Sequence, residues 1–264
     1  DPRFWRDDIV ADFDSSAEFS GDAGGGDRVN IDVGAGNSGR RLNDTIMRLL
    51  YTGLLYGLLP LALLRLYWRG RRDPGHRQRW RERFGWIPRL SEPGVLWLHA
   101  VSVGETRAAL PLIRALWEAD PNRSILVTTT TLTGSRQVRE ALGDQVWHGY
   151  APYDLPGAVR RFLRQTRPGL AIIMETELWP NLLHQCAAAG IPVLIANARL
   201  SERSMRGYAR ISWLTTPMLQ HITLIAAQSQ ADADRFRALG APRVQVMGNL
   251  KYDLALPEDL PVFE

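Results

Sequence analysis

The sequence predicts an α/β fold: a Rossmann-like, doubly wound parallel sheet preceded by one transmembrane helix. Three observations lead to this prediction. Short apolar runs alternate with amphipathic helical patterns from Val95 onward. These runs are almost continuously apolar, which is typical of parallel strands covered by helices on both faces. Upstream of them lies an apolar segment about as long as a bilayer core is thick.

The first segment, residues 1–46, is predicted to be disordered because Asp, Gly and Ser are frequent and apolar periodicity is weak. Met47 suits a natural start, which would make most of this segment a non-native extension. Residues 34–39 spell G-x-G-x-x-G after a possible strand at residues 29–33. A dinucleotide site also needs a following helix, a second parallel strand and an acidic residue about 20 positions on. The chain runs instead into its most apolar segment, so a nucleotide site is not favoured.

Residues 47–68 are predicted to form the transmembrane anchor. From Leu49 to Tyr67 the chain reads LLYTGLLYGLLPLALLRLY, and Arg65 lies near the end, where its long side chain can reach the membrane surface. A buried core helix is the alternative, but no polar face exists until the end of the run. The aromatic residues suited to the two membrane interfaces are Tyr51, Tyr67 and Trp68.

Residues 69–92 form a basic juxtamembrane segment in which arginines are interleaved with aromatic residues. By the positive-inside rule this flank, and the domain after it, face the cytoplasm. Arginines beside a membrane attract anionic headgroups by about 1 kcal/mol each. A solvated basic face and a nucleic-acid site are the alternatives, and tethering at the bilayer makes the second the weaker one. The residues are Arg69, Arg71, Arg72, Arg77, Arg79, Trp80, Arg81, Arg83, Phe84 and Trp86.

Residues 93–253 are predicted to form the Rossmann-like domain. Its predicted strands are residues 95–101, 125–130, 146–150, 170–175, 193–196, 224–227 and 244–247. The predicted helices between them are residues 106–117, 156–164, 180–189, 204–219 and 230–239.

Composition narrows the class of protein further. A chain that is 45% hydrophobic and 23% charged can bury an ordinary globular core. The single cysteine, Cys186, excludes an internal disulfide and fits a reducing compartment. The net charge of +4 comes almost entirely from arginine, with Lys251 the only lysine. Because arginine-rich usage can reflect a GC-rich genome, this charge alone does not indicate a nucleic-acid partner.

Polar residues gather where the predicted strands end. Open α/β sheets bind ligands in the crevice beyond the carboxyl ends of their strands, so these positions are the candidate site. They are Ser102, Gly104 and Glu105 after the first strand, Thr131, Gly134 and Ser135 after the second, Glu175 and Glu177 after the fourth, Arg199 after the fifth, and Lys251 after the seventh. No spacing of His, Cys, Asp or Glu suggests a metal site.

Each of these residues also has a structural interpretation. Glu105, at a predicted helix start, would be a favourable partner of the helix dipole. Glu175 ends a hydrophobic strand, where a carboxylate is costly unless it is functional or held in a buried salt bridge. Glu177 is expected to help cap the next helix. The threonine run is typical of a β-branched strand, although Thr131, Gly134 and Ser135 could hold a phosphate at a helix start. His99 is expected to be a core residue.

Several segments resemble the 3-deoxy-D-manno-octulosonic acid (Kdo) transferase family from about Met47 to Asp253. They are HAVSVGET (99–106), ILVTTTTLTGS (125–135), YDLPGAVRRFL (153–163), METELWPNLL (174–183), NARLSERS (197–204) and GNLKYD (248–253). The resemblance implies the N-terminal half of a GT-B glycosyltransferase. Such an enzyme moves Kdo from CMP-Kdo to the lipid A precursor, lipid IVA, at the cytoplasmic face of the bacterial inner membrane, in lipopolysaccharide biosynthesis. It implies inversion at the sugar and neither a metal nor a cofactor, since CMP-Kdo is a co-substrate.

The resemblance also implies roles for individual residues. Glu105 would be the general base, and Glu175 and Lys251 would stabilise the transition state. The N-terminal domain would bind the acceptor, whereas CMP-Kdo would bind a missing C-terminal donor domain to which residues 254–264 begin the linker. This chain is therefore expected to be inactive alone. The expected substrate-binding residues are Ser102, Gly104, Thr131, Gly134, Ser135, Glu177 and Arg199.

Two rival functions remain at this point. A membrane-tethered lipid-binding module without catalysis would need the same anchor and half a cleft. Another GT-B enzyme, such as a sugar-nucleotide epimerase, would not need the anchor and basic flank, so their presence argues against it. The expected partners are the lipid A precursor and anionic membrane lipids, with no nucleic acid.

Overall fold

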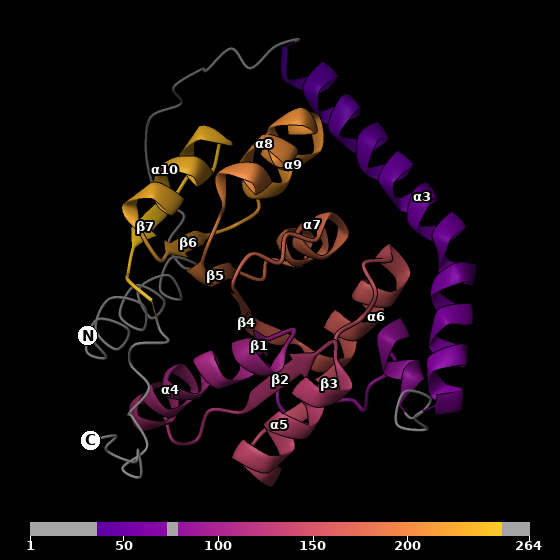
Figure 1. The fold of residues 1–264 in the computed structure, drawn as a ribbon, viewed down its shortest axis with the longest axis vertical. Helices are drawn as coiled ribbons and strands as arrows, with labels where there is room; N and C mark the ends of the chain where they lie inside the picture. The colour runs from indigo at the N-terminus through magenta and orange to yellow at the C-terminus, as the bar shows by residue number, and fades with distance from the viewer. Residues whose placement is uncertain (1–35, 73–78, 250–264) are drawn as a thin grey trace, which may run out of the picture.

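The computed structural model describes residues 36–72 and 79–249, with side chains described for 45–71 and 79–249. Figure 1 shows one α/β domain with a long helix on its outside. The helices are α3 (Gly36–Arg72), η4 (Trp80–Phe84), α4 (Val103–Ala119), α5 (Leu132–Leu142), η5 (Gly143–Gln145), α6 (Pro156–Thr166), α7 (Pro180–Ala188), α8 (Glu202–Arg210), α9 (Ser212–Leu219) and α10 (Gln230–Ala238). The strands are β1 (Val95–His99), β2 (Ile125–Thr129), β3 (Trp147–Tyr150), β4 (Pro168–Met174), β5 (Val193–Ala198), β6 (Leu224–Ala227) and β7 (Val244–Val246).

The strands form a single parallel sheet in the order β3-β2-β1-β4-β5-β6-β7. The chain builds outward from β1 to β3 and then returns to the other side of β1 with β4. The strand order therefore reverses between β1 and β4, where α/β sheets of this kind place their ligand crevice. The predicted fold class and all seven predicted strands are confirmed, with small shifts at their ends.

Two apolar cores lie on the two faces of the sheet, because successive residues of a buried strand point to opposite sides. In β1, Trp97 packs into the core that contains Phe162 of α6, whereas Leu98 packs into the core that contains Leu112 of α4. Figure 1 shows α4 and α5 on one side of the sheet and α6 and α7 on the other. Helices on both faces explain why the strands are almost continuously apolar.

Two helix predictions were wrong in detail. The expected helix at residues 204–219 is two helices, α8 and α9, because Ile211 leaves the helical conformation with ψ at 36°. The hydroxyl of Thr215 donates to the carbonyl of Tyr208 at 3.1 Å across this break. Helix α5 was missing from the predicted helix ranges, although a helix start was expected at Thr131, which caps it; Val138 and Leu142 bury one of its sides.

Helix α3 begins at Gly36, ahead of the expected anchor start at Met47, so residues 36–46 are helical rather than disordered. Residues 1–35, including the possible strand at residues 29–33, lie outside the described part of the chain. The stretch Thr45–Arg71 is long and apolar enough to cross a membrane, by length and composition. Its large exposed hydrophobic residues are Ile46, Leu49, Leu50, Leu54, Tyr56, Leu58, Leu61, Leu64, Tyr67 and Trp68.

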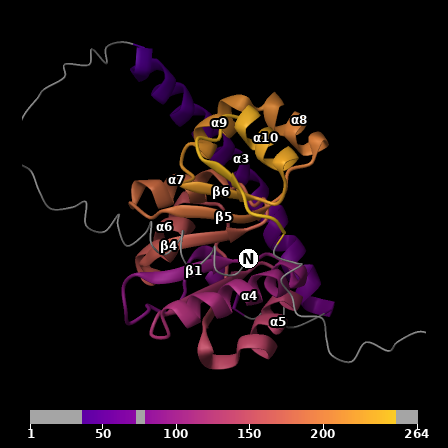
Figure 2. The same cartoon turned by 90° about the vertical axis from the view of Figure 1, so that its left-hand side faces the viewer.

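One side of α3 nevertheless contacts the domain, against α7 and α9. Positions that are at least partly buried recur every three or four residues, at Met47, Tyr51, Leu55, Leu59, Leu63, Leu66 and Gly70. Figures 1 and 2 show α3 running along the outside of the domain, with its amino-terminal end extending beyond it. The apolar residues between these positions face outward.

Within the basic segment, η4 packs against α6 and β3. Arg83 donates from Nη2 to the carbonyl of Thr130 at 2.9 Å and stacks 4.3 Å from the centre of the Tyr150 ring. At Gly85, with φ of 77°, an added Cβ would lie 2.1 Å from the carbonyl oxygen of Ala158, so only glycine fits this close approach. Trp80 and Trp86 remain about half exposed, at 46% and 50%.

Candidate active site at the carboxyl ends of β1 and β4

The candidate site is built on the two strands that flank the reversal of strand order. The loop after β1 leads into α4 and carries Glu105, and the loop after β4 leads into α7 and carries Glu175 and Glu177. Because β1 and β4 are paired and parallel, both loops leave the same edge of the sheet. The predicted convergence of these carboxylates rests on that pairing.

Glu105 lies in the first turn of α4 and is only 7% exposed. Its Oε1 accepts from the hydroxyl of Ser102 at 2.8 Å, and its Oε2 accepts from the backbone N–H of Val101 at 2.7 Å. The Ser102 hydroxyl in turn accepts from the backbone N–H of Glu105 at 3.3 Å. This is a capping-box arrangement in which each carboxylate oxygen is held by one donor. It orients the carboxylate and leaves lone pairs available.

Burial raises the pKa of Glu105 above its ordinary value, and the nearby charge of Glu175 raises it further. The hydrogen bonds from Ser102 and Val101 act in the opposite direction but do not outweigh burial. The dipole of a helix start favours an ionised Glu105, but burial makes the net shift of its pKa upward. A raised pKa makes a carboxylate a stronger proton acceptor near neutral pH.

Glu175 follows the last residue of β4 with a backbone φ of 58°, in the left-handed region that non-glycine residues rarely adopt. Its N–H donates to the carbonyl of Ala196 at 2.8 Å. Asn197, at the end of the neighbouring strand β5, has a φ of 56°. Such backbone conformations cost about 1–3 kcal/mol each and cluster at functional sites. Two of the four non-glycine residues with positive φ in the described part of the chain lie side by side at this edge.

Glu177 was expected to cap α7, and that prediction was wrong. Its Oε2 accepts from the indole N–H of Trp179 at 2.8 Å, while no side chain of its own loop caps the helix. Burial raises the pKa of Glu177, and the charges of Glu105 and Glu175 raise it further. The three carboxylates are therefore close enough to influence one another.

The threonine-rich loop after β2 is held by its own capping contacts. Thr131 accepts from the N–H of Gly134 at 3.0 Å and donates to the carbonyl of Val101 at 3.2 Å. An added Cβ at Gly134 would lie 2.9 Å from the Thr131 hydroxyl, so the loop packs tightly there. Ser135 is fully buried. These contacts join the loop to Val101, whose N–H donates to Glu105, so the loop supports the position of Glu105. Substrate contact by Thr131, Gly134 and Ser135 stays a prediction.

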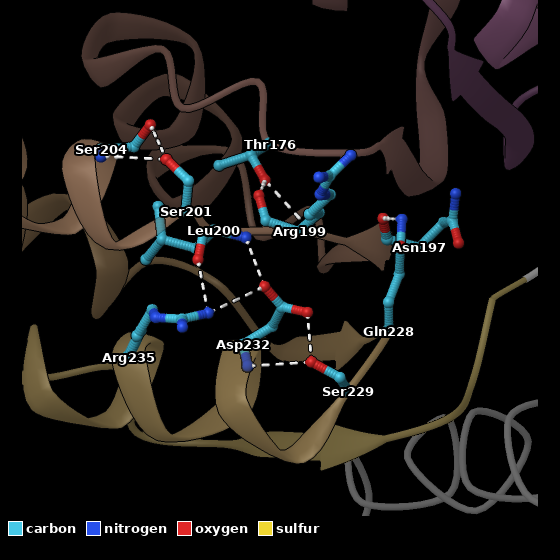
Figure 3. A network of polar contacts seen from close by, with 10 residues as sticks. All are labelled: Thr176, Asn197, Arg199, Leu200, Ser201, Ser204, Gln228, Ser229, Asp232 and Arg235. Atoms are coloured by element: carbon cyan, nitrogen blue, oxygen red, sulfur yellow. Dashed lines mark hydrogen bonds and ion pairs between the residues drawn. The ribbon is translucent and has the colours of Figure 1, made fainter.

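Arg199 is exposed on the loop after β5, and Figure 3 shows its guanidinium directed away from Asp232. The Thr176 hydroxyl donates to the Arg199 carbonyl and accepts from the Arg199 N–H at 3.2 Å, which ties this loop to the residue after Glu175. The Arg199 backbone therefore lies beside the loop that carries Glu175 and Glu177. A cation at this position can bind an anionic group of a ligand. Gly104 is likewise exposed, one residue before Glu105.

Two supporting carboxylates were not identified from the sequence. Asp232 accepts from the N–H of Leu200 at 2.9 Å and lies 3.6 Å from Arg235, which holds the Arg199 loop in place (Figure 3). The spacing of Ser229 and Asp232 is a capping-box signature that could have revealed it. Asp154 binds the start of α7 through the N–H groups of residues 181 and 182 and had no such local signature.

Three further predictions concern His99, Lys251 and the absence of a metal site. His99 is a core residue, 1% exposed, whose Nδ1 lies 3.0 Å from the Thr128 hydroxyl, and burial lowers its pKa to about 4. Lys251 lies outside the described residues. Within 45–71 and 79–249, no cluster of three or more His, Cys, Asp or Glu side chains is arranged to hold a metal ion.

Replacing Glu175 with glutamine is expected to lower the pKa of Glu105, because it removes a neighbouring negative charge. Replacing Ser102 with alanine is expected to raise it, because a hydrogen bond to the ionised form is lost. Carbon-13 NMR titration of the glutamate carboxyl groups measures both shifts. Glu140→Gln, an exposed change on α5, is the matched control. An unchanged Glu105 titration in Glu175→Gln would show that the two carboxylates do not interact.

The chain matches a known protein family over about two thirds of its length. The sequence pattern of the family described as 3-deoxy-D-manno-octulosonic-acid transferase (kdotransferase) matches residues 78–254. A 3-deoxy-D-manno-octulosonic acid transferase of Haemophilus influenzae is 44% identical over 217 residues, covering 81% of the chain and 51% of the relative. A probable mitochondrial 3-deoxy-D-manno-octulosonic acid transferase of Arabidopsis thaliana is 40% identical over 208 residues, covering 77% and 46%. One of Bordetella pertussis is 39% identical over 217 residues, covering 79% and 50%. The chain thus spans about half the length of these relatives.

Proposed function

Because the chain belongs to the 3-deoxy-D-manno-octulosonic acid (Kdo) transferase family, we propose that it forms the acceptor-binding half of an enzyme that transfers Kdo from CMP-Kdo to lipid IVA. One observation carries the proposal. Glu105 is a buried, oriented carboxylate of raised pKa at the point where the strand order reverses, beside Glu175. This is what a general base for a sugar hydroxyl requires.

In the proposed reaction, Glu105 takes the proton of an acceptor hydroxyl as its oxygen attacks the anomeric carbon of Kdo. A new carbon–oxygen bond forms, and the bond to CMP breaks with its electron pair leaving on the CMP phosphate. Attack opposite the leaving group inverts the configuration. The proposed displacement uses no metal and no cofactor.

Glu175 and Lys251 are proposed to stabilise the transition state. A carboxylate beside the anomeric carbon offsets the positive charge that develops on the sugar ring, and an ammonium offsets negative charge on the departing phosphate. The strained backbone of Glu175 fits this role, because the surrounding sheet holds the side chain where a relaxed loop would not. Arg199 is proposed to bind an anionic group of a substrate.

The exposed apolar side of α3 is proposed to attach the domain to the cytoplasmic face of the bacterial inner membrane. The aromatic side chains of Trp68, Trp80 and Trp86 are exposed, as suits residues at a membrane interface. A single pass across the bilayer, which the length of α3 allows, requires its contacts with α7 and α9 to open. The bond from Thr52 to Asn181 of α7 is one of these contacts, and the bond from Tyr51 to Asp154, in the loop before α6, would open as well.

The test is a transfer assay with CMP-Kdo and lipid IVA. Since this chain matches only about half of the length of each relative, CMP-Kdo is proposed to bind a further part of the whole protein. The chain alone is expected to bind lipid IVA without transferring Kdo, and the whole protein is expected to transfer it. Transfer by the chain alone would contradict this division of labour. Binding of lipid IVA without transfer by either form would favour a lipid-binding module instead.

A further inference from the structure

An open groove of about 670 Å³ lies between α6 and α7, at the opposite edge of the sheet from the carboxylates. It is lined by Pro168, the first residue of β4, whereas Glu175 follows the last. A strand of this length separates the two edges by about 20 Å. The groove is therefore distinct from the site proposed for Kdo transfer. Its polar lining consists of Arg160, Arg164, Arg167, His184 and Gln185.

The groove is positively charged and contains no carboxylate. Arg160 and Arg164 are exposed, one turn apart on α6, and repel each other. Neither forms an ion pair within the part of the chain that the structure describes. The negative end of the α6 dipole accounts for Arg164 and Arg167 near the last turn. It does not account for Arg160, which lies in the first half of the helix.

Arg167 is fixed in place before any ligand binds. It ends α6 in the left-handed conformation, with φ of 46°. Its Nη2 donates to the carbonyls of Leu90 and Ser91 at 2.7 and 3.0 Å. Because a guanidinium has five donor hydrogens, these bonds leave others available while they hold the planar group still.

The rest of the lining is neutral. Burial lowers the pKa of His184, and the charges of Arg48 and His221 lower it further, which favours the uncharged imidazole. Leu163 and Ile191 form apolar walls. A ligand that fits all of these features is an anion with an apolar part attached.

We propose that this groove binds the phosphate of an anionic phospholipid in the membrane to which α3 attaches. Arg48 lies near His184, and Thr52 bonds Asn181 at 3.1 Å, so α3 contacts the same helix that forms one wall of the groove. The exposed apolar side of α3 would bring headgroups to this face of the domain. The inference rests on the membrane attachment proposed above and not on Kdo transfer.

The test compares binding of the full chain to vesicles of phosphatidylcholine with and without phosphatidylglycerol. The variant Arg160→Gln/Arg164→Gln removes two exposed charges from the groove. At about a factor of five per basic residue near an anionic surface, it is expected to weaken binding to the anionic vesicles by about 25-fold. Binding to neutral vesicles is expected to be unchanged. The matched control, Arg114→Gln/Arg123→Gln, removes two exposed charges from α4 and the turn after it.

The outcomes are distinguishable. An equal loss of binding in both variants would indicate a diffuse charge effect and would contradict binding in the groove. Unchanged binding in the groove variant would contradict it as well. Displacement of the anionic vesicles by millimolar inorganic phosphate at constant ionic strength would identify free phosphate as the ligand. It would contradict the proposal that the groove binds a phospholipid. Failure of the unaltered chain to bind neutral vesicles would instead count against membrane attachment by α3. No outcome depends on transferase activity.

Discussion

Replacing Glu105 with glutamine is expected to reduce Kdo transfer by the whole protein by about 10²–10⁴-fold, the usual contribution of general base catalysis. Glutamine has the same shape and keeps one acceptor oxygen for Val101 or Ser102, but it cannot take a proton from the acceptor hydroxyl. The loss is therefore expected in kcat, with lipid IVA binding close to unchanged. Steady-state kinetics together with a direct binding measurement separate the two.

Glu202→Gln is the matched control for this change. Glu202 is an exposed glutamate in the first turn of α8, paired only with Arg206 on its own helix among the described residues, and its replacement is expected to leave kcat unchanged. Near-normal turnover in Glu105→Gln would leave Glu105 as a helix cap and remove it from catalysis.

Replacing Asp154 with alanine is expected to destabilise the chain by about 3 kcal/mol, because it leaves several donors without an acceptor. The Asp154 carboxylate accepts from the N–H groups of Asn181 and Leu182 at 3.1 and 2.7 Å. It also accepts from the hydroxyl of Tyr51 on α3 at 3.0 Å. The change thus weakens both the start of α7 and the docking of α3. Denaturant unfolding measures the first effect, and hydrogen exchange of α3 amides measures the second.

Asp144→Ala, at an exposed position, is the control and is expected to change the free energy of unfolding little. If α3 amides exchange no faster in Asp154→Ala than in this control, Asp154 does not hold the helix to the domain.

Asp154 also predicts a pH dependence of stability. Burial raises its pKa to about 6 from an ordinary value of 3.8. A carboxyl whose pKa is higher in the folded state contributes stability that is complete below about pH 4 and is lost as the pH rises through about 6. The difference corresponds to at most about 3 kcal/mol. Asp154→Asn cannot ionise, so this decline in stability between pH 4 and 6 is expected to disappear in that variant.

Much of the fold could be predicted from the sequence because its signals are local. A run such as residues 224–227 is apolar on both sides of the strand, which only a sheet covered on both faces can bury. The helix start at Pro156 and the capping residue Ser102 are likewise decided within a few residues. The position of Glu105 just after a strand and at a helix start follows from the same local signals.

The roles of the carboxylates could not be predicted, because they depend on partners distant in the chain. Glu177 looked like a helix cap, but its loop presents it to Trp179 and to the other carboxylates. Asp154 has no local capping signature, yet it caps a helix that begins more than twenty residues later. The net direction of the Glu105 pKa likewise depends on burial, which no local pattern specifies.

By itself, therefore, the sequence determined the strands, the edge at which polar residues gather, the apolar helix and the family motifs. Local periodicity and backbone preferences act over a few residues and are enough for these. Only the tertiary structure decided that β4 pairs with β1, which brings Glu105 and Glu175 together, and that one side of α3 contacts the domain. The reason is that strand pairing and burial depend on contacts between residues far apart in the chain. The same local sequence is compatible with several such tertiary arrangements.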